Sequence, residues 1–368
     1  MQLVVVGDTV LARKPRADLS APVRPGGSAL PLLARGDVTI ANLETPLTDS
    51  PDPAEKEAII SVPTSTGRHL REIGIDVVSL ATNHGMDHGP AGLRSTIAAL
   101  DDAGIRHAGG GTTLADAEAG TVLETPDGGR LTVLSFCCTL PPGANATATR
   151  PGIAPIRISQ SFAFDGPMMQ EQPGTPPIIR SAAHEEEVQR AEQRIREAKA
   201  TSDRVVICLH WGVPWCYLPE TQGPLAQYQQ PLGRRLVEAG ADVVVGTHPH
   251  CLHPVERWHD GLIIYSAGNF LFHADAATFG SRESYLTLPY QHSRLFSGPW
   301  FDSAVFEIDL RDGAAPTLRL TPVTLDPGGE PLIADADTAA RILRSVEQYC
   351  REINPAARIT PDGAVVFA

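Results

Sequence analysis

The sequence lacks the features that mark disulfide-rich, nucleic-acid-binding and membrane-spanning proteins. Its six cysteines form no Cys-x-x-Cys pair, which argues against a disulfide framework or a thiolate zinc site and favours a reducing compartment. Basic residues are scarce, with 30 Lys and Arg against 43 Asp and Glu and a net charge of −13, whereas nucleic acid and anionic membranes call for a basic face. No apolar run is long enough to cross a membrane, and no leader with a cleavage site is recognisable. We therefore expect a cytoplasmic protein without nucleic-acid or membrane partners.

A repeated pattern is present instead, in which a short apolar run rich in β-branched residues stops on polar side chains. Such runs occur at residues 3–6, 38–40, 77–80, 205–209, 243–245 and 262–265. Runs of this kind without alternation predict strands that are buried on both faces. Helical spacing of apolar residues predicts helices over residues 92–103, 184–200, 232–239 and 338–350. Strands that alternate with helices predict an α/β fold, in which ligands bind at the carboxyl ends of the strands.

The 368 residues contain no boundary that divides them, so we expect a single domain over residues 1–368. Residues 141–183 contain eight prolines and little periodicity, which predicts an irregular excursion over the surface, either a lid or a passive connection. Residues 274–302 are also irregular and could wall a substrate pocket. From about residue 303 to residue 368, alternation followed by helical spacing predicts a C-terminal extension of strands and a helix.

The polar side chains that follow the predicted strands form a candidate metal site. They are Asp8, Glu44, Asn83, His210, His248 and His250. Each has an ordinary explanation when it is taken alone, such as a helix cap for Asp8 or a turn for Asn83. Because all of them follow strands of the same kind, however, we expect them to converge on one edge of the sheet. Carboxylate, amide and imidazole ligands together suit Mn²⁺, Fe²⁺ or Zn²⁺, so we expect one or two ions of a divalent transition metal.

Six motifs, spread in order over essentially the whole chain, carry a family resemblance. They are Gly7-Asp8 with Arg13, Asn42-Leu43-Glu44, Asn83-His84 with Asp87-His88-Gly89, His210-Trp211-Gly212, Gly246-Thr247-His248-Pro249-His250 and Ser266-Ala267-Gly268-Asn269-Phe270. This series resembles the CapA family, which is named after the bacterial poly-γ-glutamate capsule biosynthesis protein and is related to the calcineurin-like metallophosphoesterases. The resemblance implies a four-layer α/β/β/α sandwich with a metal centre at one edge of the sheets.

The resemblance also implies roles for individual residues. Glu44 would bridge two metals, with Asn83, His210 and His248 completing one shell and Asp8 and His250 serving the other. His84 occupies the place of the general acid, and Asp87 would orient it. Arg13 would act in catalysis and substrate binding by clamping a phosphate or carboxylate, and Trp211 and Asn269 are assigned to substrate binding.

Two departures from the wider pattern bear on the chemistry. The first motif reads Asp8-Thr9-Val10, without the histidine of the usual Asp-x-His, so one metal site is short of a ligand. Pro214 stands where the family's His-Trp-Gly-x-Glu pattern has its glutamate. These departures leave both the number of ions and the reaction open.

The function that fits these residues is that of a metal-dependent hydrolase or acyl or amide transferase. Its small-molecule or peptide-like substrate would be a γ-glutamyl-type amide or a phosphoester, attacked by a metal-activated nucleophile with His84 as general acid. The sequence contains no Walker-type phosphate loop, so an ATP-driven ligation would need a partner protein. Two alternatives stay open: a capsule-type factor for poly-γ-glutamate synthesis or transfer, and a non-catalytic scaffold of the same fold.

Overall fold

The computed structural model describes residues 1–16, 19–50, 52–56, 58–212, 225–279, 298–311 and 314–367. Within them the larger sheet has ten strands in the order β21-β22-β19-β18-β1-β2-β4-β5, with β16 beside β1 and β20 beside β19. Their bounds are β1 (Gln2–Val10), β2 (Val38–Leu43), β4 (Val77–Ser79), β5 (Arg106–Ala108), β16 (Asn269–Phe272), β18 (Asp302–Asp309), β19 (Thr317–Leu325), β20 (Pro331–Ile333), β21 (Arg358–Ile359) and β22 (Ala364–Val366).

The second sheet has six strands in the order β14-β15-β13-β12-β8-β7. Their bounds are β7 (Thr121–Glu124), β8 (Arg130–Cys137), β12 (Arg204–His210), β13 (Val243–Thr247), β14 (Val255–Trp258) and β15 (Gly261–Ile264). Each sheet has a parallel centre, made of β1, β2, β4 and β5 in one and of β8, β12, β13 and β15 in the other. Polar residues at the carboxyl ends of these strands therefore lie along one edge within each sheet.

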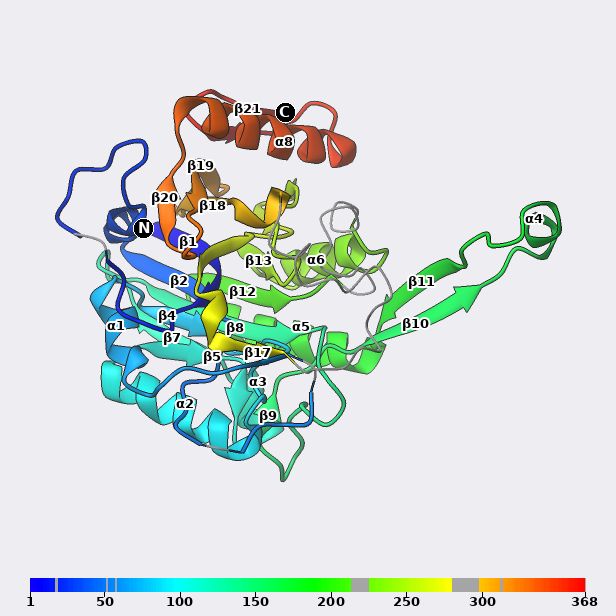
Figure 1. The fold of residues 1–368 in the computed structure, drawn as a ribbon, viewed down its shortest axis with the longest axis horizontal. Helices are drawn as coiled ribbons and strands as arrows, with labels where there is room; N and C mark the ends of the chain where they lie inside the picture. Colours follow the sequence, from blue (N-terminus) through cyan, green and yellow to red (C-terminus); the bar gives the residue numbers. More distant parts are fainter. Residues whose placement is uncertain are drawn as a thin grey trace.

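The two sheets pack face to face around a shared apolar core, to which Val5 and Ile40 contribute from one sheet and Val206 and Val245 from the other. Helices cover both outer faces (Figure 1). The ten-stranded sheet is covered by α1 (Thr66–Glu72), α2 (Gly89–Ala103) and the short η1 (Leu30–Arg35), and the six-stranded sheet by α3 (Leu114–Glu118), α5 (Glu185–Lys199) and α6 (Gln229–Glu238). The four-layer α/β/β/α sandwich is thereby confirmed.

The predicted strands and helices are found, with two notable omissions. All six apolar runs lie in strands, and the four predicted helices correspond to α2, α5, α6 and α8 (Ala336–Ile353). Sequence analysis missed β8, although it pairs with β12 from Arg204 to His210, because its run ends on Cys137 and Cys138 rather than on polar side chains. It also missed α1, which is only 7 residues long.

The prediction of an irregular excursion over residues 141–183 is wrong for residues 158–183. Strands β10 (Ile158–Ala163) and β11 (Ile178–Ala183) form an antiparallel hairpin with α4 (Gly166–Glu171) at its tip. The hairpin projects from the body of the molecule as an arm (Figure 1). Its prolines lie outside both strands, one of them in the first turn of α4, so no strand loses a ladder N–H to proline.

The C-terminal segment consists of strands and a helix, as expected, and it is built into the larger sheet. Strand β18 pairs antiparallel with the first half of β1, and β16 pairs in parallel with the second half. Helix α8 adds Ile342 and Val346 to the core between the sheets. The segment after residue 303 therefore supports the strand that carries Asp8.

Candidate metal centre

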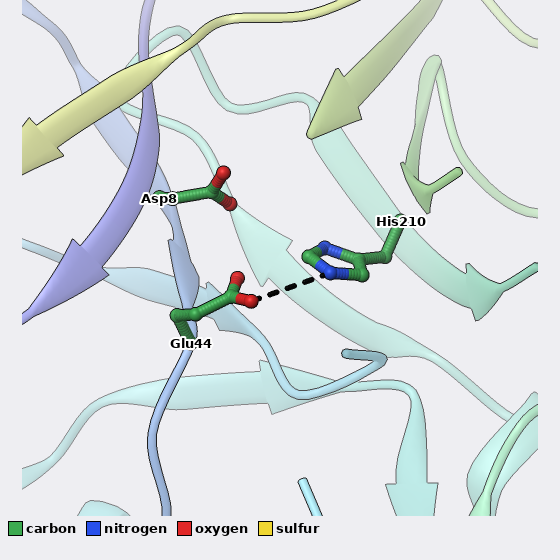
Figure 2. A group of neighbouring side chains, drawn as sticks. All are labelled: Asp8, Glu44 and His210. Atoms are coloured by element: carbon green, nitrogen blue, oxygen red, sulfur yellow. Dashed lines mark ion pairs between the residues drawn. The ribbon is translucent and has the colours of Figure 1, made fainter. Parts of the chain in front are cut away.

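Three of the predicted ligands meet where the carboxyl ends of the two sheets face each other. Asp8 lies near the end of β1, Glu44 directly follows β2, and His210 is the last residue of β12. Their potential ligand atoms all lie within 4.8 Å of one another, and the three side chains are buried. Figure 2 shows both carboxylates directed toward the imidazole ring from the opposite sheet. The convergence inferred from the strand ends is thus present, and it joins two sheets.

The Nε2 atom of His210 is the centre of a group of potential metal ligands. It lies 2.9 Å from Asn83 Oδ1, 3.0 Å from His248 Nδ1 and 3.4 Å from Glu44 Oε1. The other ring nitrogen, Nδ1, lies 3.0 Å from Thr247 Oγ1. When the Nδ1 proton of His210 is donated to Thr247 and Nδ1 of His248 carries no proton, lone pairs converge from all four side chains. A cation satisfies such a set, whereas a single shared proton cannot.

The Oε1 atom of Glu44 provides an independent test of whether the site fits a metal. It is buried and has no hydrogen-bond partner among the described residues. Leaving a buried carboxylate oxygen without a donor is costly, and a cation beside His210 Nε2 would remove that cost. The surrounding carboxylate, amide and imidazole groups fit a divalent transition metal.

His250 and Asn269 form the second half of the site, beside Asp8. The Nδ1 atom of His250 lies 2.8 Å from Asn269 Oδ1 and 3.3 Å from Asp8 Oδ2. The amide of Asn269 donates to the backbone oxygens of His250 at 3.3 Å and Trp300 at 3.1 Å. The Trp300 ring also packs against the His250 ring at a tilt of 33°, with 4.5 Å between the ring centroids. Asn269, which we assigned to substrate binding, is buried here and holds His250 in place.

The backbone around the two histidines adopts an unusual conformation. His248 and His250 have φ angles of 98° and 56°, a region that residues other than glycine rarely occupy and that is concentrated at functional sites. The intervening Pro249 fixes the offset between the two rings. Close backbone approach is also needed at Gly7, where a Cβ atom would lie 1.9 Å from the backbone oxygen of Gly268.

His84 and Asp87 lie together, and Lys56 joins them. The Nδ1 atom of His84 lies 2.6 Å from Asp87 Oδ2, and the ammonium of Lys56 donates to Asp87 Oδ1 at 2.6 Å and to the Asn83 backbone oxygen at 2.9 Å. The side chain of Asp87 is 1% exposed, so this ion pair is largely shielded from water. Sequence analysis missed Lys56, because it lies between glutamates and reads as part of a solvated charged loop.

Burial and neighbouring charges set the protonation states in the cluster. Burial lowers the pKa of His210 to about 4 and the pKa of His248 well below its usual value. Burial alone would raise the pKa of Asp8, but the hydrogen bond and charge of His250 lower it overall. Burial and the charge of Asp8 raise the pKa of Glu44. Neutral His210 and His248 and an ionised Asp8 are the forms that bind a metal, whereas Glu44, and His250 whose pKa the neighbouring Asp8 and Glu44 raise, would have to release a proton to do so.

Two predicted substrate-binding residues are engaged elsewhere. The guanidinium of Arg13 bonds Asp275 at 2.8 Å and the backbone oxygen of Gly328 at 3.1 Å. Trp211 is fully buried, donates its indole N–H to the Tyr265 backbone oxygen at 2.8 Å and stacks on the Tyr265 ring. The described contacts of the Trp211 indole are therefore packing contacts, and its assignment to substrate binding stays a prediction. Pro214 and residues 280–297 lie outside the described residues.

The fold and the cluster together define an α/β/β/α sandwich with a candidate divalent-metal centre at the carboxyl ends of its strands. The chain belongs to the bacterial capsule synthesis protein family PGA_cap, whose sequence model matches residues 2–274. The family resemblance found in the motifs is thereby confirmed.

Characterised and uncharacterised proteins resemble the chain over most of its length. The uncharacterized protein y4sH of Sinorhizobium fredii is 30% identical over 73% of this chain and 66% of its own length. The capsule biosynthesis protein CapA of Bacillus anthracis is 27% identical over 86% of this chain and 65% of its own length. The PGA biosynthesis protein CapA of Bacillus subtilis is 28% identical over 66% of this chain and 55% of its own length. The matched part thus spans 55–66% of these relatives.

A solved structure from Staphylococcus aureus, described as a 5′-nucleotidase in complex with α-ketoglutarate, covers 91% of this chain and 54% of its own, with a TM-score of 0.43 and 13% identity. Similarity at that level establishes neither a shared fold nor a shared activity. No helix among the described residues has the length and apolar character needed to span a bilayer.

Proposed function

We propose that this chain is a metal-dependent hydrolase or acyl transferase that acts on an amide bond of the γ-glutamyl type. The observation that carries the proposal is the convergence of Asp8, Glu44 and His210 within 4.8 Å, together with a buried Glu44 oxygen that lacks a described donor. The amide substrate is supported by two relatives that are named for capsule and PGA biosynthesis. The cytoplasmic location stays a prediction, since the matched part covers only a fraction of those relatives.

A bound divalent metal would supply Lewis acidity to the acyl group of the substrate. The chain's own residues would hold that metal and move the proton. The ligands would be Asp8, Glu44, Asn83, His210 and His248, with His250 beside Asp8. Mn²⁺, Fe²⁺ and Zn²⁺ all suit this set, and one ion at His210 Nε2 is the occupancy that the distances support best.

In this proposal His84 transfers the proton. Burial lowers its pKa to about 4, so the ring is neutral near pH 7. If Nδ1–H is donated to Asp87, 2.6 Å away, rather than Nδ1 accepting from the Lys56 ammonium, 3.2 Å away, then Nε2 would accept a proton from the attacking nucleophile and donate it to the departing amine. Water as nucleophile gives hydrolysis, and an amine gives transfer of the acyl group. Lys56 holds Asp87 in the position that fixes the ring.

Metal analysis of the purified protein tests the core of this proposal. We expect the wild type to contain a divalent transition metal by mass spectrometry and Glu44→Ala to lose most of it. Glu72→Ala is the matched control, because the side chain of Glu72 is 48% exposed on α1 and should not affect metal content. A wild type with no more metal than Glu44→Ala would refute the proposal.

A substrate screen then separates the reaction classes. With Mn²⁺ added, we expect release of p-nitroaniline from γ-glutamyl-p-nitroanilide and a loss of about 100-fold or more in kcat for His84→Gln. The same metal-loaded protein is assayed with p-nitrophenyl phosphate and bis(p-nitrophenyl) phosphate. Turnover of the phosphoesters alone would reassign the substrate class, and inactivity on all three would favour the scaffold alternative.

A further inference from the structure

Asn42 lies between the two carboxylates of the candidate metal centre. It belongs to the end of β2, is paired in register with Asp8 on β1, and precedes Glu44 by two residues. Its side chain is buried, and its amide nitrogen donates to Asp8 Oδ1 at 2.8 Å and to Glu44 Oε2 at 2.7 Å. One NH₂ group has two hydrogens, so a single side chain serves both carboxylates.

This double hydrogen bond occupies one oxygen of each carboxylate, and the other Asp8 oxygen, Oδ2, accepts from the backbone N–H of His248 at 3.2 Å. The remaining Glu44 oxygen, Oε1, lies 3.4 Å from His210 Nε2, and the remaining Asp8 oxygen, Oδ2, lies 3.3 Å from His250 Nδ1. Both of these oxygens therefore face imidazole nitrogens of the opposite sheet.

We propose that Asn42 is a positioning residue that holds Asp8 and Glu44 with one chosen oxygen each directed at the metal. The inference rests on the proposed function, because it requires that a metal binds. Residues that hydrogen-bond to metal-ligating carboxylates orient those carboxylates, and substitution of such a residue typically weakens metal binding by about 10- to 100-fold.

The side chain at position 42 must meet conditions that asparagine satisfies. Two donors on one nitrogen are needed to reach both carboxylates, and a neutral group adds no third negative charge to them. The Oδ1 atom of Asn42 has no hydrogen-bond partner among the described residues, so its contacts with the two carboxylates set the orientation of the amide. Leucine has a similar shape but no donor, and serine has one donor on a shorter side chain.

Co²⁺ binding to the chelator-stripped full chain tests this role without a substrate. Calorimetric titration should show Co²⁺ binding weakened by about 10- to 100-fold in Asn42→Leu and by an intermediate factor in Asn42→Ser. The visible absorption bands of bound Co²⁺ should also change, because the carboxylates are no longer fixed. If Asn42→Leu does not fold, Asn42→Ser carries the test.

Thr39→Val is the matched control on the same strand. Thr39 is buried and donates to the Leu33 backbone oxygen at 2.9 Å, so the variant removes a buried hydrogen bond from β2 away from the carboxylates. We expect it to bind Co²⁺ within about twofold of the wild type, since it leaves the ligands and their partners intact. Wild-type affinity and spectrum in both Asn42 variants would overturn this inference alone. A wild type that takes up no Co²⁺ would overturn the proposed function as well.

Discussion

We expect Thr247 to select the tautomer of His210, much as Asn42 is proposed to orient the two carboxylates. Its Oγ1 lies 3.0 Å from His210 Nδ1, and a proton held there leaves Nε2 as the metal-binding nitrogen. Thr247→Val keeps the shape and removes the acceptor, so we expect Co²⁺ affinity to fall by about 10-fold. Titration of the metal-free protein measures this loss.

Thr132→Val is the control for that variant. Thr132 is buried on β8 of the same sheet and bonds Ser202 at 2.7 Å, so its loss removes a buried hydroxyl without touching a candidate ligand. Equal Co²⁺ affinities for Thr247→Val and Thr132→Val would show that Thr247 does not select the tautomer of His210.

The protonation of His84 predicts a pH-dependent stability. Its pKa is lowered from 6.5 to about 4 by burial, so between these values the unfolded chain takes up a proton that the folded chain does not. The wild type should therefore lose stability relative to His84→Gln as the pH falls from 6.5, by up to about 3 kcal/mol, with no further change below about pH 4. Urea unfolding of both proteins in chelator across this range measures the difference. A difference that does not vary with pH would mean that His84 is charged in the folded protein.

The candidate ligands could be predicted from the sequence, but the residues that contact and orient them could not. Asp8, Glu44 and His210 are recognisable because chemically capable side chains at strand ends stand out against apolar runs. Asn42 and Lys56 belong to residue types that are common in turns and charged loops. Their roles depend on distances between segments that are far apart in sequence, and no spacing rule encodes those distances.

At the level of elements, the arm formed by β10, α4 and β11 stands apart from the sandwich. Two strands without further partners gain little stability by themselves, and the arm carries exposed aromatic side chains, with Phe162 58% and Phe164 63% exposed. We expect replacement of residues 159–182 by a short Gly-Ser linker to leave the thermal unfolding midpoint and the metal content nearly unchanged. Calorimetry measures the unfolding midpoint and metal analysis measures the metal content. A fall of more than about 5 °C in the unfolding midpoint would show that the arm supports the core.

The arm and β8 also show why some elements escaped prediction. Proline content suggested irregular structure over residues 141–183, but a hairpin tolerates prolines when they fall in its tip and connections. Strand β8 is as apolar as its neighbours, yet no functional residue follows it. A search for apolar runs that end in polar side chains therefore finds the strands that carry candidate site residues. It misses strands such as β8 that lack such residues at their ends.

At the level of the whole molecule, the site depends on both sheets being packed together. Asp8 and Glu44 come from one sheet and His210 from the other, so no half of the sandwich contains the metal centre. Without a metal, two buried carboxylates lie in one cluster, and the Asp8 charge raises the pKa of Glu44. Binding of a cation should therefore stabilise the sandwich as a unit.

Removal and return of metal test this coupling between the site and the fold. A ligand at 100 times its dissociation constant stabilises the folded state by about 2.7 kcal/mol, which corresponds to a shift of about 3 °C in a chain of this size. We expect a chelator to lower the unfolding midpoint of the wild type by at least that amount and Mn²⁺ or Zn²⁺ to restore it. Glu44→Ala should show no such response, because it has lost a ligand. An equal response in both proteins would place the bound metal outside the cluster formed by Asp8, Glu44 and His210.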